Sequence, residues 1–136
     1  LKSANIVHGG LITKNKSAIN TYTEMLPIRY GPVDEPKLLY EFSPGIAYSL
    51  TFDQGIKLDS KHTAMIKQRS SILRCGAIIT SGLYDPGFSC DHIGAVMHTN
   101  AQIKIEKGAR VAQLFMFENY EAQLYDGQYQ GNKDVK

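Results

Sequence analysis

The stretch QRSSILRCGAIITSGLYDPGF, residues 68–88, carries two arginines, a serine pair and a carboxylate in close succession. Arg69 stands directly before the serines, and the pattern predicts a short helix with Ser70 as its N-cap and Gly76 as its stop. Free amides at the start of a helix, with hydroxyls and a guanidinium beside them, suit an anion, and phosphate is the one we expect. The alternative is that Ser70 merely caps the helix while Arg69 and Arg74 are solvated.

A carboxylate follows at the end of the same stretch. Asp85 precedes Pro86 and Gly87, and this order of residues predicts a tight, rigid turn. A carboxylate held beside a phosphate can orient and activate a water molecule. Asp before Pro is also an ordinary turn former, so Asp85 by itself fits both a catalytic and a purely structural role.

The composition is that of a soluble globular domain. The chain has 136 residues, of which 43% are hydrophobic and 21% charged, with a net charge of +2. This charge is too small to indicate a nucleic-acid partner, and no apolar run approaches the ~18 residues of a membrane span or forms a signal peptide. Cys75 and Cys90 lack further ligands at zinc-finger spacing, so we expect free thiols in a cytoplasmic protein, with a disulfide between them as the alternative.

Most of the chain predicts short β-strands separated by turns, and therefore an all-β sandwich or jelly roll with one short helix. Residues 2–37 are irregular in pattern, and we expect short strands and long connections there. The remaining predicted strands are residues 38–42, 46–52, 62–68, 93–99, 101–107, 110–117 and 122–125. We expect one domain over residues 1–126 and a mobile polar arm over residues 127–136.

Three motifs in order resemble one family. Residues 69–71 (RSS), 82–88 (GLYDPGF) and 108–114 (GARVAQL) are similar to the second, third and fourth motifs of the trimeric dUTPase and dCTP deaminase superfamily, in its archaeal or viral dUTPase-like branch. Residues 41–59 resemble the strand pair before the second motif, and the likeness extends from Leu38 to about Gly131. It implies a distorted jelly-roll barrel that forms a homotrimer with active sites between subunits.

The resemblance also implies an activity, the Mg²⁺-dependent hydrolysis of dUTP to dUMP and pyrophosphate. Asp85 would activate the attacking water, and Gln113 would hydrogen-bond the water or a phosphate. The Mg²⁺ ion would be held mainly by substrate phosphates and waters rather than by protein ligands. The substrate-binding residues that the resemblance implies are Arg69, Ser70, Ser71 and Arg74 for the triphosphate, Phe88 under the deoxyribose, the hairpin backbone at Gly94, Ala95 and Val96 for the pyrimidine, and Tyr129 and Gln130 in a lid.

Two other functions stay open beside dUTP hydrolysis. A deaminase of this superfamily needs a glutamate in the strand after the third motif, but the strand GAVMHT carries no carboxylate and Met97 stands in that place. His98 lies next to it, and a single strand histidine is more often structural than catalytic. A nucleotide-binding protein without activity ranks second, ahead of deamination, and the intact Asp85 turn argues against it.

The sequence departs from the family at both ends. The first motif is not recognisable before Leu38, and the glycine-rich fifth motif is absent. In place of the fifth motif stands LYDGQYQG, residues 124–131, similar to the tail of deaminase-branch proteins. Tyr129, Gln130 and Gly131 would form a lid over the nucleotide or a frayed terminus, and the sequence favours neither.

Overall fold

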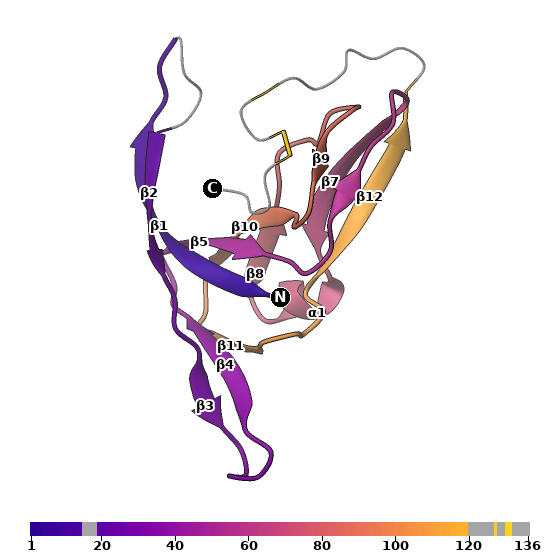
Figure 1. Cartoon of the computed structure of the whole chain (residues 1–136). Helices are drawn as coiled ribbons and strands as arrows, with labels where there is room; N and C mark the ends of the chain where they lie inside the picture. Colours follow the sequence, from indigo (N-terminus) through magenta and orange to yellow (C-terminus); the bar gives the residue numbers. More distant parts are fainter. Residues whose placement is uncertain (15–18, 120–126, 128–129, 132–136) are drawn as a thin grey trace.

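The computed structural model describes residues 1–14, 19–119, 127 and 130–131, and it is built almost entirely of β-strands (Figure 1). Its elements are β1 (Ser3–Leu11), β2 (Ile19–Glu24), β3 (Ile28–Tyr30), β4 (Lys37–Phe42), β5 (Ala47–Thr51), β6 (Ile56–Lys57), β7 (His62–Gln68), α1 (Ser70–Arg74), β8 (Ala77–Thr80), β9 (Ser89–Cys90), β10 (Gly94–Thr99), β11 (Ile103–Glu106) and β12 (Ala112–Glu118). No helix among the described residues is long and apolar enough to cross a membrane.

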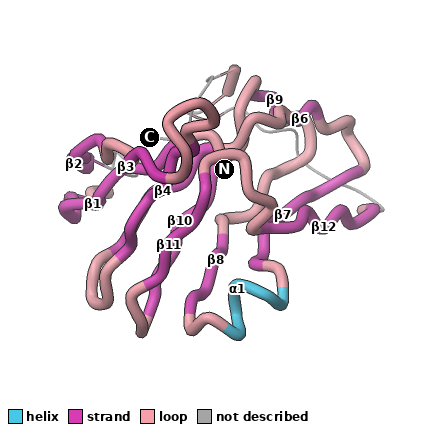
Figure 2. The backbone as a smooth tube through the Cα atoms, turned by 90° about the horizontal axis from the view of Figure 1, so that it is seen from below, coloured by secondary structure: helices cyan, strands magenta, loops and turns pink. Residues whose placement is uncertain are grey.

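The described strands form three sheets. The largest has the order β12-β7-β8-β10-β5-β1-β2, a second has the order β11-β4-β3, and β6 pairs with β9. Neighbours in these sheets are mostly distant in sequence, as in a jelly roll, and the predicted all-β fold with one short helix is confirmed. Figure 2 shows α1 beside β8 and β7, at the same end of the molecule as the start of β12.

The core lies between the sheets and follows the period of two that a strand imposes. In β11 Ile103 and Ile105 are buried while Lys104 and Glu106 are exposed, as their alternation predicts. The largest fully buried side chains come from five strands and are Phe42, Leu50, Ile66, Ile79 and Met97. One hydrophobic core therefore joins the large sheet to β4 and β11.

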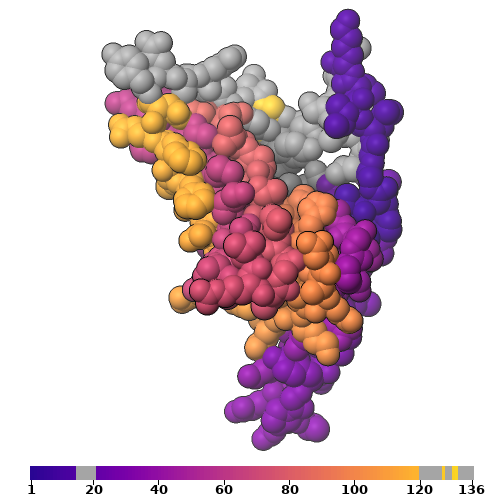
Figure 3. Space-filling view, turned by 180° about the vertical axis from the view of Figure 1, so that it is seen from behind, coloured from indigo at the N-terminus to yellow at the C-terminus, as the bar shows by residue number. Residues whose placement is uncertain are grey.

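The N-terminal region is more regular than its sequence pattern predicts. β1 is nine residues long and pairs with β2 on one side and β5 on the other. The expectation of short strands was wrong here because the pairing partner β5 orders the segment, and local residue preferences do not report a distant partner. Figure 3 shows this indigo hairpin projecting at one end of the molecule and the purple β3–β4 segment at the other.

Two local predictions have opposite outcomes. Gly76 has a positive φ of 90° directly after the end of α1, so its role as the helix stop is confirmed. Ser70 is not the N-cap: Arg69 occupies that position with extended backbone, and no side chain caps the helix.

Cys75 and Cys90 are free thiols, exposed and buried respectively. The predicted strand at residues 122–125 and most of the predicted arm lie outside the described residues.

Candidate active site

Arg69 and Gln113 meet at the end of β7. The Arg69 amide donates to the Val111 carbonyl at 3.0 Å, and its Nη1 donates to the Arg110 carbonyl at 3.3 Å. Gln113 lies opposite Lys67 in the β7–β12 pair, and its Nε2 donates to the Gln68 carbonyl at 3.4 Å. The second and fourth motifs, far apart in the sequence, are thus neighbours in the fold.

A hollow of about 410 Å³ opens beside these residues. Its lining includes Arg69, Arg110 and Gln113, together with Asp53 and Gln54 from the loop after β5. Two arginines against one carboxylate make it a net positive cavity, which suits an anionic ligand. The sequence analysis assigned no role to Arg110. Its position in the middle of the fourth motif could have indicated one.

Ser70 and Ser71 form the exposed first turn of α1, next to the N-cap Arg69. Their amides have no intrahelical acceptor, which leaves them free to bind an anion. α1 has only five residues, so its dipole is small and the Arg69 charge is the stronger attraction. Arg74 is exposed in the last turn of α1, at the opposite end from Arg69.

Asp85 begins a tight turn of the type its sequence predicts. Pro86 and Gly87 occupy the central positions, Gly87 has a φ of 86°, and the Phe88 amide donates to the Asp85 carbonyl at 3.0 Å. A positive φ at the third position defines a type II turn, which glycine adopts without steric cost. Asp85 is exposed, so the turn presents its carboxylate to the outside.

The segment before the turn is joined to β7 by both backbone hydrogen bonds of one residue pair. The Ala64 amide donates to the Tyr84 carbonyl at 3.0 Å, and the Tyr84 amide donates to the Ala64 carbonyl at 2.7 Å. The Tyr84 hydroxyl donates to the Gly94 carbonyl and accepts the Gly94 amide, and burial raises the pKa of Tyr84 to about 12. These contacts hold the residue next to Asp85 in one orientation.

The segment after the turn is held by residues 57–59. The Leu58 amide donates to the Phe88 carbonyl at 2.8 Å, and the Gly87 amide donates to the Asp59 carbonyl at 3.0 Å. The Asp59 carboxylate in turn accepts from His62 Nδ1 at 2.7 Å and from the Lys61 amide, and these bonds lower its pKa. The Asp85 turn is therefore a fixed part of the sheet rather than a free loop.

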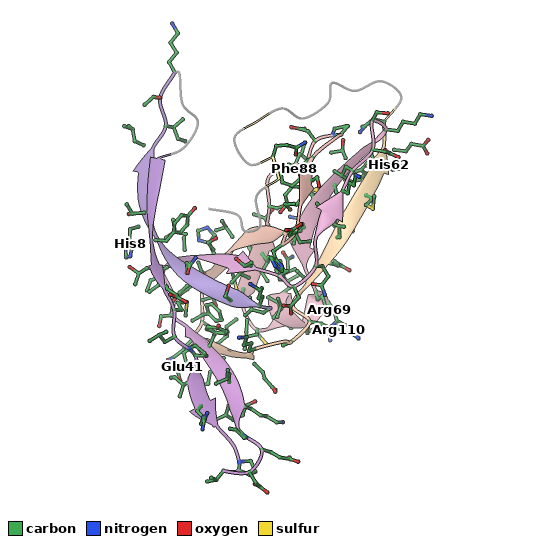
Figure 4. The ribbon with its side chains drawn as sticks, viewed as in Figure 1. His8, Glu41, His62, Arg69, Phe88 and Arg110 are labelled. Atoms are coloured by element: carbon green, nitrogen blue, oxygen red, sulfur yellow. The ribbon has the colours of Figure 1, made fainter. Side chains whose placement is uncertain are left out.

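Arg69 and the Asp85 turn do not meet within one chain. Ala64, which anchors the turn, and Arg69 are 69 − 64 = 5 residues apart along an extended strand, or roughly 16 Å at about 3.3 Å per residue. Figure 4 shows the same separation, with Phe88 and His62 near the top of the view and Arg69 and Arg110 well below them, beside α1. The sequence-predicted site residues thus form two groups.

Phe88 belongs to the core of the described chain. Its side chain is 3% exposed and stacks on Tyr84 with ring centroids 5.1 Å apart. The ring therefore packs on the residue that precedes Asp85. A contact of Phe88 with deoxyribose stays a prediction.

Gly94, Ala95 and Val96 lie in β10, between β5 and β8, and not in a hairpin tip. Residues 91–93 join β9 to β10 directly before them. The Gly94 N–H and C=O are both bonded to the Tyr84 hydroxyl. Only Val96 of the three is exposed, so reading of a pyrimidine by this backbone stays a prediction.

The predicted lid residues and possible metal ligands are placed as follows. Gln130 is bonded to the Asp85 turn, as described below, whereas Tyr129 lies outside the described residues. Within the described part of the chain, no group of three His, Cys, Asp or Glu side chains is placed to hold a metal ion.

The chain belongs to the dCTP deaminase-like family, whose sequence model matches residues 15–119. Similar curated proteins include three archaeal ones named probable deoxyuridine 5'-triphosphate nucleotidohydrolase. The protein of Aeropyrum pernix is 33% identical over 67% of this chain and 58% of its own length. That of Methanopyrus kandleri is 29% identical over 74% and 66%, and that of Halobacterium salinarum is 32% identical over 64% and 52%. The chain thus spans about half to two thirds of the length of these relatives.

Proposed function

We propose that this chain hydrolyses dUTP to dUMP and pyrophosphate at a site shared between two copies of the chain. The observation that carries the proposal is the pair of half-sites at opposite ends of β7: a positive hollow at Arg69 and an exposed carboxylate on the fixed turn at Asp85. The Arg69 half can bind phosphate but has no Asp85 carboxylate beside it, and the Asp85 half has the carboxylate but not the arginines. The names of the similar archaeal proteins support dUTP as the substrate.

Each group then has a chemical role. Arg69, with the hydroxyls of Ser70 and Ser71, binds the triphosphate, and Gln113 donates a hydrogen bond to a phosphate oxygen or to the water. Asp85 of the neighbouring copy accepts a proton from a water whose oxygen bonds to the α-phosphorus, while the bond from that phosphorus to pyrophosphate breaks. Positioning and charge stabilisation supply most of the rate increase in such a reaction.

Mg²⁺ fits this site as an ion carried by the substrate. Among the described residues that line the hollow, Asp53 is the one carboxylate, which is too few for a protein cage. When bound, the ion would neutralise phosphate charge. The chain's own contribution is then the fixed geometry of Arg69 and Asp85.

The outer edge of β12 supports the association of copies that this site needs. β12 is the last strand of the large sheet, and four consecutive apolar residues on it are between 39% and 55% exposed, namely Leu114, Phe115, Met116 and Phe117. An apolar, unpaired edge strand in water invites contact with another chain. We propose a homotrimer, with β12, including its residue Gln113, at the interface.

Deamination lacks an acid or base in the described chain at the expected place. Met97, which stands where the deaminase glutamate is expected, is 0% exposed and packs in the core. His98 is exposed on β10 opposite Ile78 and Ala47, both apolar. The strand therefore offers no carboxylate to move a proton to an exocyclic amine.

The experiment is product analysis by anion exchange after incubation with dUTP and, separately, with dCTP, each with and without Mg²⁺. Mg²⁺-dependent conversion of dUTP to dUMP and pyrophosphate is the expected result. Formation of dUTP or dUMP from dCTP would overturn the assignment in favour of deamination. Binding of both nucleotides without turnover of either would place the protein among nucleotide-binding proteins without activity.

A further inference from the structure

Gln130 is bonded to the Asp85 turn through its side chain. Its Nε2 donates to the Gly87 carbonyl at 2.9 Å, and its Oε1 accepts the Ser89 amide at 2.9 Å. The next residue continues the contact, since the Gly131 amide donates to the Ser89 carbonyl at 2.7 Å. Three hydrogen bonds thus join this part of the C-terminal segment to Gly87 in the turn and to Ser89 at the start of β9.

These bonds complete the backbone pairing of residues 87–89. One edge of this segment is paired with residues 57–59, as described above. On the other edge the Gly87 carbonyl and both backbone groups of Ser89 would face outward without partners, as at any sheet edge. Gln130 and Gly131 satisfy all three groups, so they take the place of a further strand.

The carboxamide suits this task because of its chemistry. The edge presents an acceptor at Gly87 and a donor at Ser89, and a glutamine side chain offers a donating NH₂ group and an accepting carbonyl oxygen in one plane. A carboxylate would offer acceptors alone, and an aliphatic side chain would offer neither. The match is specific to the residue type.

We propose that Gln130 is a positioning residue, which fixes the Asp85 turn through the backbone of Gly87 and Ser89 in its own chain. The inference rests on the proposed function for its effect on activity. Gly87 is a central residue of the turn that begins at Asp85, so a bond that holds the Gly87 carbonyl helps to hold the backbone that carries Asp85. Both polar atoms of the Gln130 side chain are engaged in this contact, which differs from a direct contact with substrate.

Two variants separate the parts of this contact. Gln130→Met keeps the length of the side chain and removes both polar atoms, whereas Gln130→Glu keeps the acceptor for Ser89 and loses the donor to Gly87. Gln102→Met is the matched control, because Gln102 is an exposed glutamine at the start of the β11 segment. All three changes lie outside the hydrophobic core.

The first readout is amide hydrogen exchange at Ser89 in the protein without nucleotide. Gln130→Met is expected to speed exchange at Ser89 about tenfold or more, Gln130→Glu less, and the control not at all, because exchange follows local opening. This readout does not depend on hydrolysis, so it tests the contact even if dUTP is not turned over. Unchanged exchange at Ser89 in Gln130→Met would overturn the proposal.

The second readout is steady-state hydrolysis of dUTP by the same proteins. Gln130→Met is expected to lower kcat roughly tenfold and to change KM less than about threefold, since a misplaced base affects the chemical step more than binding. A rise in KM with unchanged kcat would assign Gln130 to substrate binding and overturn the positioning role. If the unmodified protein does not hydrolyse dUTP, the proposed function is refuted, whereas the hydrogen-exchange result still tests the Gln130 contact.

Discussion

Arg69 and Asp85 lie at opposite ends of β7, although they are only 85 − 69 = 16 residues apart in sequence. The chain leaves β7, forms α1 and β8, and returns to pair Tyr84 with Ala64 near the start of the same strand. Each chain therefore presents an anion-binding end and a carboxylate end that face different surroundings. This arrangement suggests sites completed by a neighbour.

The first prediction is that inactive variants complement one another. Asp85→Asn and Arg69→Ala should each abolish hydrolysis, and Asp85→Asn should still bind dUTP within a few-fold, because its side chain serves the water. In a refolded equimolar mixture, a site needs an intact Asp85 from one copy and an intact Arg69 from the next. Each of these two conditions is met by half of the chains, so random assembly should restore about a quarter of the normal activity.

The control for this prediction is the formation of mixed oligomers, measured by mass from differently tagged chains. If mixed oligomers form and no activity returns, both groups act within one chain and the shared site is refuted. Recovery in a mixture that contains no mixed oligomers would mean that one variant was never inactive.

The second prediction concerns the apolar edge of β12. Phe115→Lys replaces one of the four exposed apolar side chains that we assign to the interface with a charge, and it should shift the protein to monomers at micromolar concentration. Light scattering after size exclusion measures the change, and activity should fall with it. Val33→Lys, at a 98% exposed position in the loop between β3 and β4, is the control. An unchanged mass for Phe115→Lys would remove β12 from the interface.

The third prediction concerns Tyr84. Tyr84→Phe removes the partner of both backbone groups of buried Gly94, which should lower the free energy of unfolding by about 1–3 kcal/mol. Burial raises the pKa of Tyr84 from 10.0 to about 12, so its contribution is complete below pH 10 and is lost as the pH rises toward 12. Urea unfolding at pH 8 and pH 11 should show a smaller difference between variant and parent at the higher pH. Equal differences at the two values would contradict this account.

The fourth prediction concerns Gly55, which lies against the loop after β9. A Cβ on Gly55 would stand 2.6 Å from the carbonyl oxygens of Cys90 and Asp91, and backbone atoms cannot move aside cheaply. Gly55→Ala should therefore lower the free energy of unfolding by about 1–3 kcal/mol, as overpacking does. Gly82→Ala, where nothing lies within 4 Å of the added atom, should change it little. Equal effects in the two variants would show that the loop between β5 and β6 can shift to make room for the added atom.

Parts of the fold and of the site follow directly from the sequence. Ile103 and Ile105 alternate with polar residues, and β11 is paired and buried as that pattern predicts. Asp85, Pro86 and Gly87 form the expected turn, because proline and glycine fix its dihedral angles locally. Local patterns succeed where the deciding interactions lie within a few residues.

Other parts depend on distant partners. β1 is long because β5 pairs with it, and Arg69 takes the N-cap position because its amide is bonded to Val111. Phe88 is covered by Tyr84, and Gln130 reaches Gly87 and Ser89 from more than forty residues away. No local rule reports such contacts, which is why the separation of Arg69 from Asp85 became visible only in the fold.

The two-ended arrangement around β7 has a consequence for the dose of faulty copies in a cell. Under the proposed assembly, each chain contributes Asp85 to one active site and Arg69 to another. A chain damaged at Asp85 alone spoils one site and still completes its neighbour's, whereas a chain damaged at both ends spoils two. The number of damaged ends, rather than the number of damaged chains, would then set how far a mutant allele suppresses a normal one.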